Sequence, residues 1–537
     1  MWELLIKNGL IVDGTGRPAF VGSVAIDKGR IIQVSKMALE GHFREVIDAD
    51  GLLVAPGFID IHRHGDLAPF RKQKDGEEIR QGITTMINGN CGFSAVPSSE
   101  MYFELLKDYA RPIMGDIPDF LKGMGTHRFF EAANKRPLHG NIGYLVGNGA
   151  LRIAVKGFDA SPMTRTELDQ VCGLLRSSLE EGAFGLSLGL MYVPENFYSF
   201  QELAEICQIP GRMGRIVTAH IRGEGSGLLN SVSEIIKLAR VCGGIFHISH
   251  LKAAGRRNWH TEIAAALDMI HKARNEGINV SFDVYPYCAG STALYTLFPP
   301  KLMEGGMKEL LKHLRDPVVR KRLENELKGE QKDWDNLVAS TGWKAVTLVG
   351  GNAPDYVGRT VEDIAVERGC SPESCAMDLM LENQGDIPIV FHSMCQEDME
   401  RVLYDPDSIV ISDALYSEGG VPHPRRYGSF ARLISQYGNK LGLERAIQKI
   451  TSAPAQRLGL FERGKIEEGM AADLVILDLQ HFADTATYEK PVSYPEGIRI
   501  VVVNGKIACR EGRPSDDFYG KLLRKGGMAC RQMADMV

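Results

Sequence analysis

Residues 215–251, RIVTAHIRGEGSGLLNSVSEIIKLARVCGGIFHISHL, carry the pattern that decides the fold of this chain. Two short apolar runs, RIVTAHI and IFHISHL, are rich in β-branched residues and predict strands. They enclose the segment LLNSVSEIIKLARVCG, whose apolar residues recur at helical spacing. A strand, a helix and a second strand in this order are typical of a βαβ unit, in which the two strands lie parallel in one sheet.

The same alternation runs from Gly57 to about Lys449. It includes the strand AFGLSLGL at 183–190, a helix at 260–277 and the strand NVSFDVYPY at 279–287. About eight such repeats over roughly 390 residues favour a closed (β/α)8 TIM barrel over an open sheet, and they leave extra length for an insertion. The predicted fold class is therefore α/β.

Both ends of the chain are typical of β-structure instead. The first 55 residues contain short strands broken by glycines, and a similar composition returns in GKIEEGMAADLVILD, residues 464–478. We expect the two ends to form one small β-sandwich domain, and the charged stretch after Pro299 predicts an α-rich insertion. The predicted boundaries are 1–56 with 455–515 for the β-sandwich domain, 57–454 for the barrel, 299–369 for the insertion and 516–537 for a loosely docked tail.

Composition limits the class of protein. The 537 residues are 44% hydrophobic and 24% charged, which is ordinary for a globular protein and argues against disorder. The net charge is −6 and the chain has no long run of Lys or Arg, so the sequence lacks the basic patch that binding to nucleic acid or an anionic membrane requires. The expected partner is therefore a small-molecule substrate. Ten Cys without CxxC pairs and an N-terminus unlike a signal peptide predict a cytoplasmic protein. The sequence leaves a monomer or a homodimer open.

The strongest local signal for chemistry is PGFIDIHRHGD, residues 56–66. His62 and His64 lie two apart at the end of an apolar strand, where the period of two points both imidazoles to one side. Two such nitrogens can share one metal ion, and active sites lie at the carboxyl ends of barrel strands. Taken alone, the pair could equally be two hydrogen-bonded histidines.

Four further residues that can bind a metal end other predicted strands: Cys91, His220, His250 and Asp413. Thiolate, imidazole and carboxylate are ligands that zinc prefers in proteins. Each residue alone has a structural explanation, since a free Cys is usually inert packing and a single His or Asp often satisfies the core or a turn. His247, two residues before His250, is expected to be a hydrogen-bonded core histidine and is not counted as a metal ligand. Six metal-competent residues at the strand ends of one barrel favour a metal site over coincidence.

Longer motifs make the pattern specific. The chain contains GITTMINGNCGFS, GLSLGLMYVP, AHIRGE, ISHLK, DVYPY and SDALYSEGGVPHPRRYGSF. Together with PGFIDIHRH, these motifs resemble the amidohydrolase superfamily, and in particular its D-aminoacylase (N-acyl-D-amino-acid deacylase) branch. The resemblance covers nearly the whole chain, including the split β domain and the insertion. It implies zinc-dependent hydrolysis of the amide bond of N-acyl-D-amino acids.

The resemblance also implies a division of the metal ligands. Cys91, His220 and His250 are expected to hold a tightly bound Zn²⁺, and His62, His64 and Asp413 to form an adjoining, weaker second site. Many binuclear relatives bridge their metals with a carboxylated lysine at the end of the fourth strand. That strand has the sequence AFGLSLGL here, so Cys91 is expected to supply a thiolate in its place. This substitution counts against a hydantoinase or a dihydroorotase.

The expected chemistry is attack of zinc-activated water on the amide. Asp413 is the expected general base, which accepts the proton of the water and later delivers it to the departing amine. By resemblance, Tyr192 donates to the developing oxyanion and Arg425 grips the α-carboxylate of the substrate. From the residues alone, Tyr192 could be a rim aromatic and Arg425 a surface charge. The expected supporters of Arg425 are Lys252, Tyr285 and Ser291.

Two positions depart from the family pattern. Arg63 stands between the histidines where smaller residues are usual, and Asn148 in VGNGALR stands where a histidine is expected. The second departure puts substrate preference in question rather than hydrolysis.

The alternative substrates are cyclic amides, carbamoyl compounds and N-blocked dipeptides. The alternative of another class is a non-catalytic assembly protein, against which the six retained metal-competent residues argue.

Overall fold

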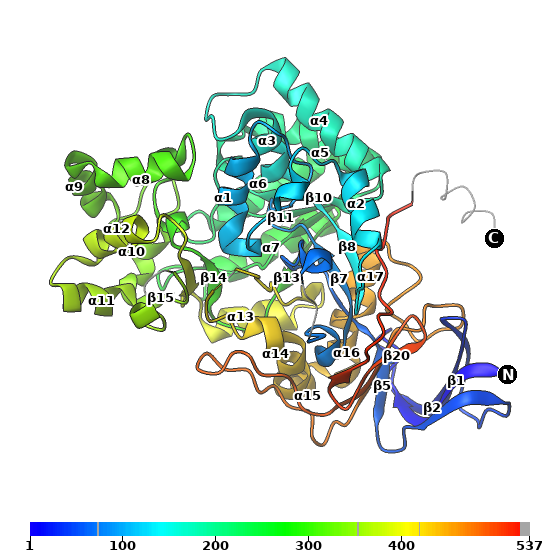
Figure 1. Cartoon of the computed structure of the whole chain (residues 1–537). Coiled ribbons are helices and arrows are strands. Elements are labelled where there is room, and N and C mark those ends of the chain that lie inside the picture. Colours follow the sequence, from blue (N-terminus) through cyan, green and yellow to red (C-terminus); the bar gives the residue numbers. More distant parts are fainter. Residues whose placement is uncertain (72–74, 352–353, 418, 527–537) are drawn as a thin grey trace.

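The computed structural model describes residues 1–71, 75–351, 354–417 and 419–526 (Figure 1). Its centre is a barrel built from two runs of parallel strands. The first run consists of β6 (Phe58–Asp60), β7 (Ile83–Asn88) and β8 (Asn141–Tyr144). The second consists of β9 (Val146–Gly147), β10 (Gly185–Gly189), β11 (Ile216–His220), β12 (Ile245–Ile248), β13 (Val280–Val284) and β17 (Ser408–Val410).

The two runs close into one barrel. Only Leu145 separates β8 from β9, so the two act as one interrupted strand. At the other seam, the nitrogen of His64 donates to the carbonyl of Ala414 at 3.0 Å and the nitrogen of Asp413 donates to the carbonyl of His62 at 3.0 Å. With β8 and β9 counted as one, eight parallel strands of the described part of the chain surround the axis, which confirms the predicted (β/α)8 fold.

Helices alternate with the strands of the barrel. Those that the sequence predicts after the third, fifth and sixth strands are α4 (Arg165–Glu180), α6 (Leu228–Cys242) and α7 (Glu262–Asn275). α4 starts at a capping box made by Thr164 and Glu167. The other helices of this layer are α1 (Phe103–Met114), α2 (Thr126–Asn134), α3 (Asn148–Lys156), α5 (Phe200–Arg212), α13 (Gln396–Tyr404), α14 (Arg425–Arg432), α15 (Gly438–Leu441), α16 (Leu443–Lys449) and α17 (Ser452–Leu458).

Both chain ends contribute to a second, β-rich domain, as the sequence predicts. β5 (Leu53–Pro56) pairs antiparallel with β18 (Leu474–Leu477), and this pairing joins the two ends in one sheet. The sheet curls around its own apolar cluster, which includes Ile6, Val24 and Ile476. Its other strands are β1 (Trp2–Ile11), β2 (Phe20–Asp27), β3 (Arg30–Ser35), β4 (Phe43–Asp48), β19 (Ile498–Val503), β20 (Lys506–Arg510) and β21 (Arg513–Pro514).

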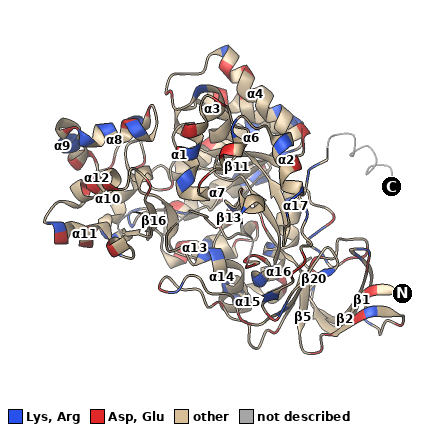
Figure 2. Cartoon of the chain, viewed as in Figure 1, with Lys and Arg blue, Asp and Glu red and all other residues tan. Residues whose placement is uncertain are grey.

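A helical group lies to one side of the barrel (Figure 1). A small antiparallel sheet of β14 (Gly290–Ala293), β16 (Pro388–Phe391) and β15 (Val346–Leu348) joins it to the barrel. Its helices are α8 (Met307–Arg315), α9 (Pro317–Glu326), α10 (Leu337–Thr341), α11 (Val361–Arg368) and α12 (Pro372–Glu382). Figure 2 shows charged residues along α8, α9 and α11. The predicted insertion at 299–369 falls inside this group, which also takes in α12, β14 and β16.

The last described residues run along the barrel. The nitrogen of Ile142 in β8 donates to the carbonyl of Lys521 at 2.9 Å, and the nitrogen of Leu523 donates to the carbonyl of Ile142 at 2.7 Å. The expected tail is therefore tied by backbone hydrogen bonds up to this point, and residues 527–537 lie outside the described part. The boundaries given for the domains stay predictions. Among the described residues, no helix has the length and apolar character needed to cross a bilayer.

Candidate metal centre

The six predicted metal ligands meet at the carboxyl end of the barrel. All six are buried, and each lies at the end of a strand or in the turn after it. Five of them line one pocket of about 570 Å³: His64, Cys91, His220, His250 and Asp413. The sixth, His62, contacts Cys91. The side chains that the sequence analysis selected from distant segments therefore lie together.

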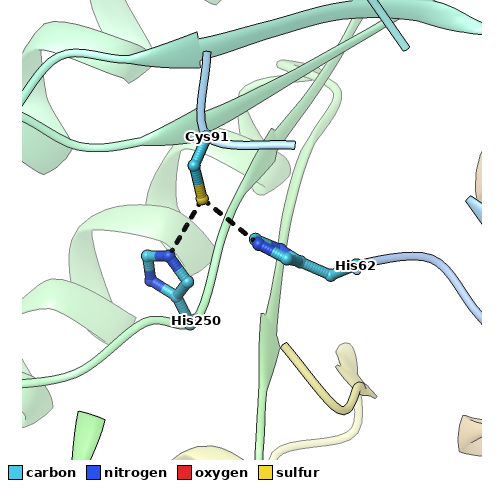
Figure 3. Close-up of side chains that lie close together, drawn as sticks. All are labelled: His62, Cys91 and His250. Atoms are coloured by element: carbon cyan, nitrogen blue, oxygen red, sulfur yellow. Dashed lines mark hydrogen bonds between the residues drawn. The ribbon is translucent and has the colours of Figure 1, made fainter. Parts of the chain in front are cut away.

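Two histidines flank the thiol of Cys91 (Figure 3). Its Sγ lies 3.2 Å from Nε2 of His62 and 3.4 Å from Nε2 of His250. Burial acts to raise the pKa of Cys91, but the charges of the two imidazoles outweigh it and hold the pKa well below its usual value. The site therefore favours the thiolate, the form in which cysteine binds a metal.

Asp413 forms a second group with His62 and His64. Its Oδ1 lies 3.5 Å from Nε2 of His62 and 3.3 Å from Nε2 of His64. Its Oδ2 lies 2.9 Å from Nη2 of Arg425. Burial acts to raise the pKa of Asp413, but Arg425 and His62 hold it well below its usual value. The carboxylate is therefore charged at neutral pH.

Glu224 also belongs to the site, although the sequence analysis did not select it. Its Oε1 accepts a hydrogen bond from Nζ of Lys252 at 2.5 Å and lies 3.2 Å from Nδ1 of His250. It is 3.6 Å from Nε2 of His220. The available signal was the AHIRGE motif, in which Glu224 follows His220 by four residues.

The donor atoms form three overlapping groups. Within each group the atoms lie within 4.8 Å of one another, and the groups are His62–Cys91–His250, His62–His64–Asp413 and His220–Glu224–His250. These groups share His62 and His250, so they cross the expected division into a tight and a weak site. That division stays a prediction.

Three of the candidate ligands adopt left-handed backbone conformations. The φ angles of Cys91, His250 and Asp413 are 52°, 35° and 49°. Residues other than glycine rarely adopt this region, and they do so mostly where function requires it. Each of the three strands therefore ends in a sharp turn whose side chain lines the pocket.

Asp283 in β13 contacts three histidines from inside the barrel, His62, His247 and His250. It accepts a hydrogen bond from the backbone nitrogen of His250, and its Oδ2 lies 3.6 Å from Nδ1 of His62. The same oxygen contacts Nε2 of His247 at 2.8 Å, and Nδ1 of His247 contacts Ser281 at 2.6 Å. His247 is thus a satisfied core histidine. The sequence did not single out Asp283, because it lies inside the strand β13 rather than at the end of it.

Arg425, the predicted carboxylate clamp, contacts two of its predicted supporters, Tyr285 and Ser291. Its guanidinium lies 4.6 Å from the ring centroid of Tyr285, and its Nη2 donates to the carbonyl of Ser291 at 3.4 Å. Its Nε is buried and has no hydrogen-bond partner among the described residues. Arg425 lines the metal pocket together with Lys252, Tyr285 and Ser291, and Tyr192, the expected oxyanion donor, lines it too.

Comparison with known proteins places this site in a family. The amidohydrolase family model matches residues 45–127 and 344–509. The N-acyl-D-aspartate deacylase of Alcaligenes xylosoxydans xylosoxydans is 30% identical over 98% of this chain and 95% of its own length. The D-aminoacylase of the same organism is 29% identical over 98% of both chains. This chain belongs to the D-aminoacylase family of amidohydrolases.

Solved structures agree with this membership. An N-acyl-D-glutamate deacylase from Bordetella bronchiseptica, complexed with zinc and a phosphonate inhibitor, has a TM-score of 0.81 at 30% identity, over 97% of this chain and 99% of its own. A D-aminoacylase has a TM-score of 0.81 at 28% identity, over 98% and 100%. A D-hydantoinase, at 16% identity and a TM-score of 0.56, shares the fold alone.

The two departures from the D-aminoacylase pattern lie outside the pocket. Arg63 is fully buried and pairs with Asp60 at 3.2 Å and Glu78 at 3.3 Å, away from the metal ligands. Asn148 donates to Oε2 of Glu195 at 3.0 Å, and the same oxygen accepts from the nitrogen of Gly189 at 2.9 Å. Asn148 therefore acts on the pocket through Glu195, which bonds to the end of β10 and lies against Gly92, the residue after Cys91.

The donor set of this D-aminoacylase relative fits a zinc ion. Imidazole nitrogens, a thiolate and carboxylates converge within reach of one another, and these are the ligands that zinc takes in proteins. Nδ1 of His64 and Nδ1 of His220 are buried without a hydrogen-bond partner among the described residues. Buried polar groups are usually satisfied, so these two nitrogens are compatible with a metal-binding role.

Proposed function

We propose that this amidohydrolase cleaves the amide bond of N-acyl-D-amino acids with the help of zinc, and releases a carboxylate and a free D-amino acid. The observation that carries the proposal is the contact between Asp413 and Arg425 at 2.9 Å. The contact supports the proposal because the carboxylate that approaches His62 and His64 also pairs with a cation, and a cation of this kind suits an α-carboxylate. The preference for the D isomer rests on the relatives, which are deacylases of D-amino acids.

The metal would be held by the converging side chains. Cys91, His220 and His250 are the proposed ligands of a tight Zn²⁺, and His62, His64 and Asp413 those of a weaker second site. A zinc ion bound there supplies a Lewis acid that polarises the amide carbonyl and acidifies water. The thiolate form of Cys91 suits this role.

Asp413 is the proposed general base and acid. The lowered pKa of Asp413 keeps the group in the carboxylate form, which is the form that can accept a proton from the attacking water. The same group then passes the proton to nitrogen as the C–N bond breaks. One carboxylate within reach of both atoms serves both steps.

Tyr192 is the proposed oxyanion donor. Its ring lies 4.8 Å from that of His220, and it lines the pocket. Burial raises the pKa of the hydroxyl well above its usual value, so Tyr192 keeps its proton and can donate it in a hydrogen bond. A donor placed in this way typically contributes about 3 kcal/mol to the stability of the transition state.

Arg425 is the proposed clamp for the α-carboxylate. A planar guanidinium can make two parallel hydrogen bonds to a carboxylate, and the unpartnered Nε of Arg425 is available for one of them. Lys252, Tyr285 and Ser291 are the proposed supporters. A cyclic amide without a free carboxylate gains nothing from this clamp, so we favour the open-chain substrate over that alternative.

Paired N-acetyl-D- and N-acetyl-L-amino acids test the proposal. The release of free amine by the zinc-replete protein should be confined to D isomers, and Asp413→Asn should lower kcat by about a thousandfold or more while the fold is retained. Comparable turnover of L isomers, or full activity of Asp413→Asn, would refute the assignment.

A further inference from the structure

His423 is a buried histidine beside the proposed carboxylate clamp. It stands in the stretch VPHPRR, residues 421–426, two residues before Arg425. Of these two residues, Arg425 lines the metal pocket and His423 does not. Any effect of His423 on the substrate therefore has to pass through another residue.

One ring nitrogen of His423 holds the start of α14. The first backbone N–H groups of a helix have no carbonyl partner inside that helix. The backbone nitrogen of Arg425, the first residue of α14, donates instead to Nδ1 of His423 at 3.0 Å. A residue before proline is biased toward an extended backbone, so Pro424 keeps His423 outside the helix. The imidazole thus fixes the point at which the Arg425 side chain leaves the backbone.

The other ring nitrogen of His423 bonds to the segment that carries Ser291. Because Nδ1 accepts, the proton of the neutral ring lies on Nε2, which donates to the carbonyl of Ala289 at 3.0 Å. Two residues farther along both segments, Nη2 of Arg425 donates to the carbonyl of Ser291 at 3.4 Å. The segments 423–425 and 289–291 are therefore joined twice, and the imidazole makes one of the two connections.

The surroundings of His423 keep its ring neutral and oriented. The ring centroids of Tyr287 and Tyr488 lie 5.3 and 5.1 Å from that of His423, and both rings meet it edge to face. The hydroxyl of Tyr488 is 3.3 Å from Nε2. Burial and the charge of Arg425 hold the pKa of His423 well below its usual value. A neutral imidazole offers one acceptor and one donor, which are the two groups that the bonds to Arg425 and Ala289 require.

We propose that His423 is a positioning residue for substrate binding, which holds the Arg425 clamp in place relative to Ser291. This inference rests on the proposed function, in which Arg425 grips the α-carboxylate. A guanidinium makes two parallel hydrogen bonds to a carboxylate only when its plane is well placed, so a less restrained Arg425 binds the substrate more weakly. Arg425 stays charged beside Asp413 in either case. The loss therefore falls on KM rather than on kcat.

Two substitutions at position 423 separate the bond to Arg425 from the filling of space. His423→Ala removes both ring nitrogens. His423→Asn supplies a side-chain carbonyl that can accept from the backbone nitrogen two residues later, as asparagine does in turns. With N-acetyl-D-leucine and zinc-replete protein, we expect KM to rise about tenfold or more in His423→Ala, with kcat within about threefold of its original value. His423→Asn should bring KM back to within about threefold of the original value.

His392→Ala is the matched control. His392 also packs against Tyr488, with 5.1 Å between the ring centroids, but it does not line the metal pocket. This variant should change neither KM nor kcat, and metal analysis should find the original zinc content in all three variants. An unchanged KM in His423→Ala, an equal rise in His423→Asn, or a loss of zinc from either of them would overturn the positioning role. No turnover of N-acetyl-D-leucine by the unaltered protein would instead overturn the proposed function, and this inference with it.

Discussion

Charged groups at the candidate site occur as close pairs. Burial acts to raise the pKa of Glu224, but Lys252 at 2.5 Å holds it far below its usual value. Arg425 does the same for Asp413. Glu224 is locked against Lys252 and His250, whereas Asp413 lies between the metal donors and the carboxylate clamp. This difference in surroundings supports the proposal that Asp413 transfers the proton and that Glu224 positions its neighbours.

The clamp gives the first prediction at this scale. Arg425→Lys keeps a positive charge but loses the planar pair of donors, so KM for an N-acetyl-D-amino acid should rise by about tenfold or more. Steady-state kinetics over a range of substrate concentrations measures the change. Arg426→Lys is the matched control, because Arg426 pairs with Glu77 at 2.6 Å and does not line the metal pocket. An unchanged KM in Arg425→Lys would remove Arg425 from substrate binding.

The pocket walls give a second prediction, on the side chain of the substrate. Of the described residues that line the metal pocket, Lys252 and Arg425 alone carry a permanent positive charge, and each already contacts a carboxylate. The remaining wall is largely apolar and includes Ile113, Phe391 and Leu415. A second carboxylate on the substrate would be buried without a cation, which is costly.

N-acetyl-D-asparagine and N-acetyl-D-aspartate isolate this charge effect, because they have nearly the same shape. The asparagine derivative should have a kcat/KM about tenfold or more higher, and N-acetyl-D-leucine should exceed both. A preference for the aspartate derivative would show that a cation serves its side chain. This chain would then resemble its N-acyl-D-aspartate deacylase relative in specificity as well as in sequence.

Residue types and strand positions in the sequence predicted the candidate metal ligands, but not the residues that hold these ligands in place. His62, His64, Cys91, His220, His250 and Asp413 could be selected because each stands at a strand end, where a barrel gathers side chains. Glu224 and Asp283 escaped selection, since one lies in a loop of unpredictable path and the other inside a strand. Which donors group together depends on loop geometry that spacing does not contain.

At the scale of elements, the loop after β11 depends on the helical group. Asp335 precedes α10 and accepts hydrogen bonds from the backbone of residues 224 and 225, beside the candidate ligand His220. An insertion that is distant in sequence thus fixes the loop that carries Glu224. The charged composition of the insertion predicted exposed helices, and α9 indeed buries only Leu323. The composition of the insertion did not predict the hydrogen bonds that Asp335 accepts from the loop after β11.

Asp335→Asn tests this support. The amide keeps the shape but loses the charge that strengthens the hydrogen bonds, so the free energy of unfolding should fall by ~1–2 kcal/mol and kcat by about threefold or more. Asp333→Asn, two residues away, has no such partner in the described contacts and should change neither quantity. Chemical denaturation and steady-state assays supply the two readouts. If Asp335→Asn behaved like Asp333→Asn, the loop would hold its place without the insertion.

At the scale of the whole molecule, the seam of the barrel coincides with the site. The bond from the nitrogen of Asp413 to the carbonyl of His62 closes the barrel and also joins two candidate ligands. The regular alternation of strands and helices predicted the closed barrel, and the β-rich ends predicted a shared domain. The sequence predicted a loosely docked tail but not the backbone hydrogen bonds between residues 521–523 and β8, because such bonds leave no pattern in the side chains.

The dependence of hydrolysis on metal tests the central claim most directly. Protein stripped with a chelator should be inactive toward N-acetyl-D-leucine, and titration with Zn²⁺ should restore activity as the first equivalent binds. Cys91→Ala, measured in parallel, should bind zinc at least about tenfold more weakly and stay inactive at one equivalent. Full activity of the stripped protein, or normal zinc binding and turnover by Cys91→Ala, would contradict a metal-dependent hydrolytic centre at this pocket.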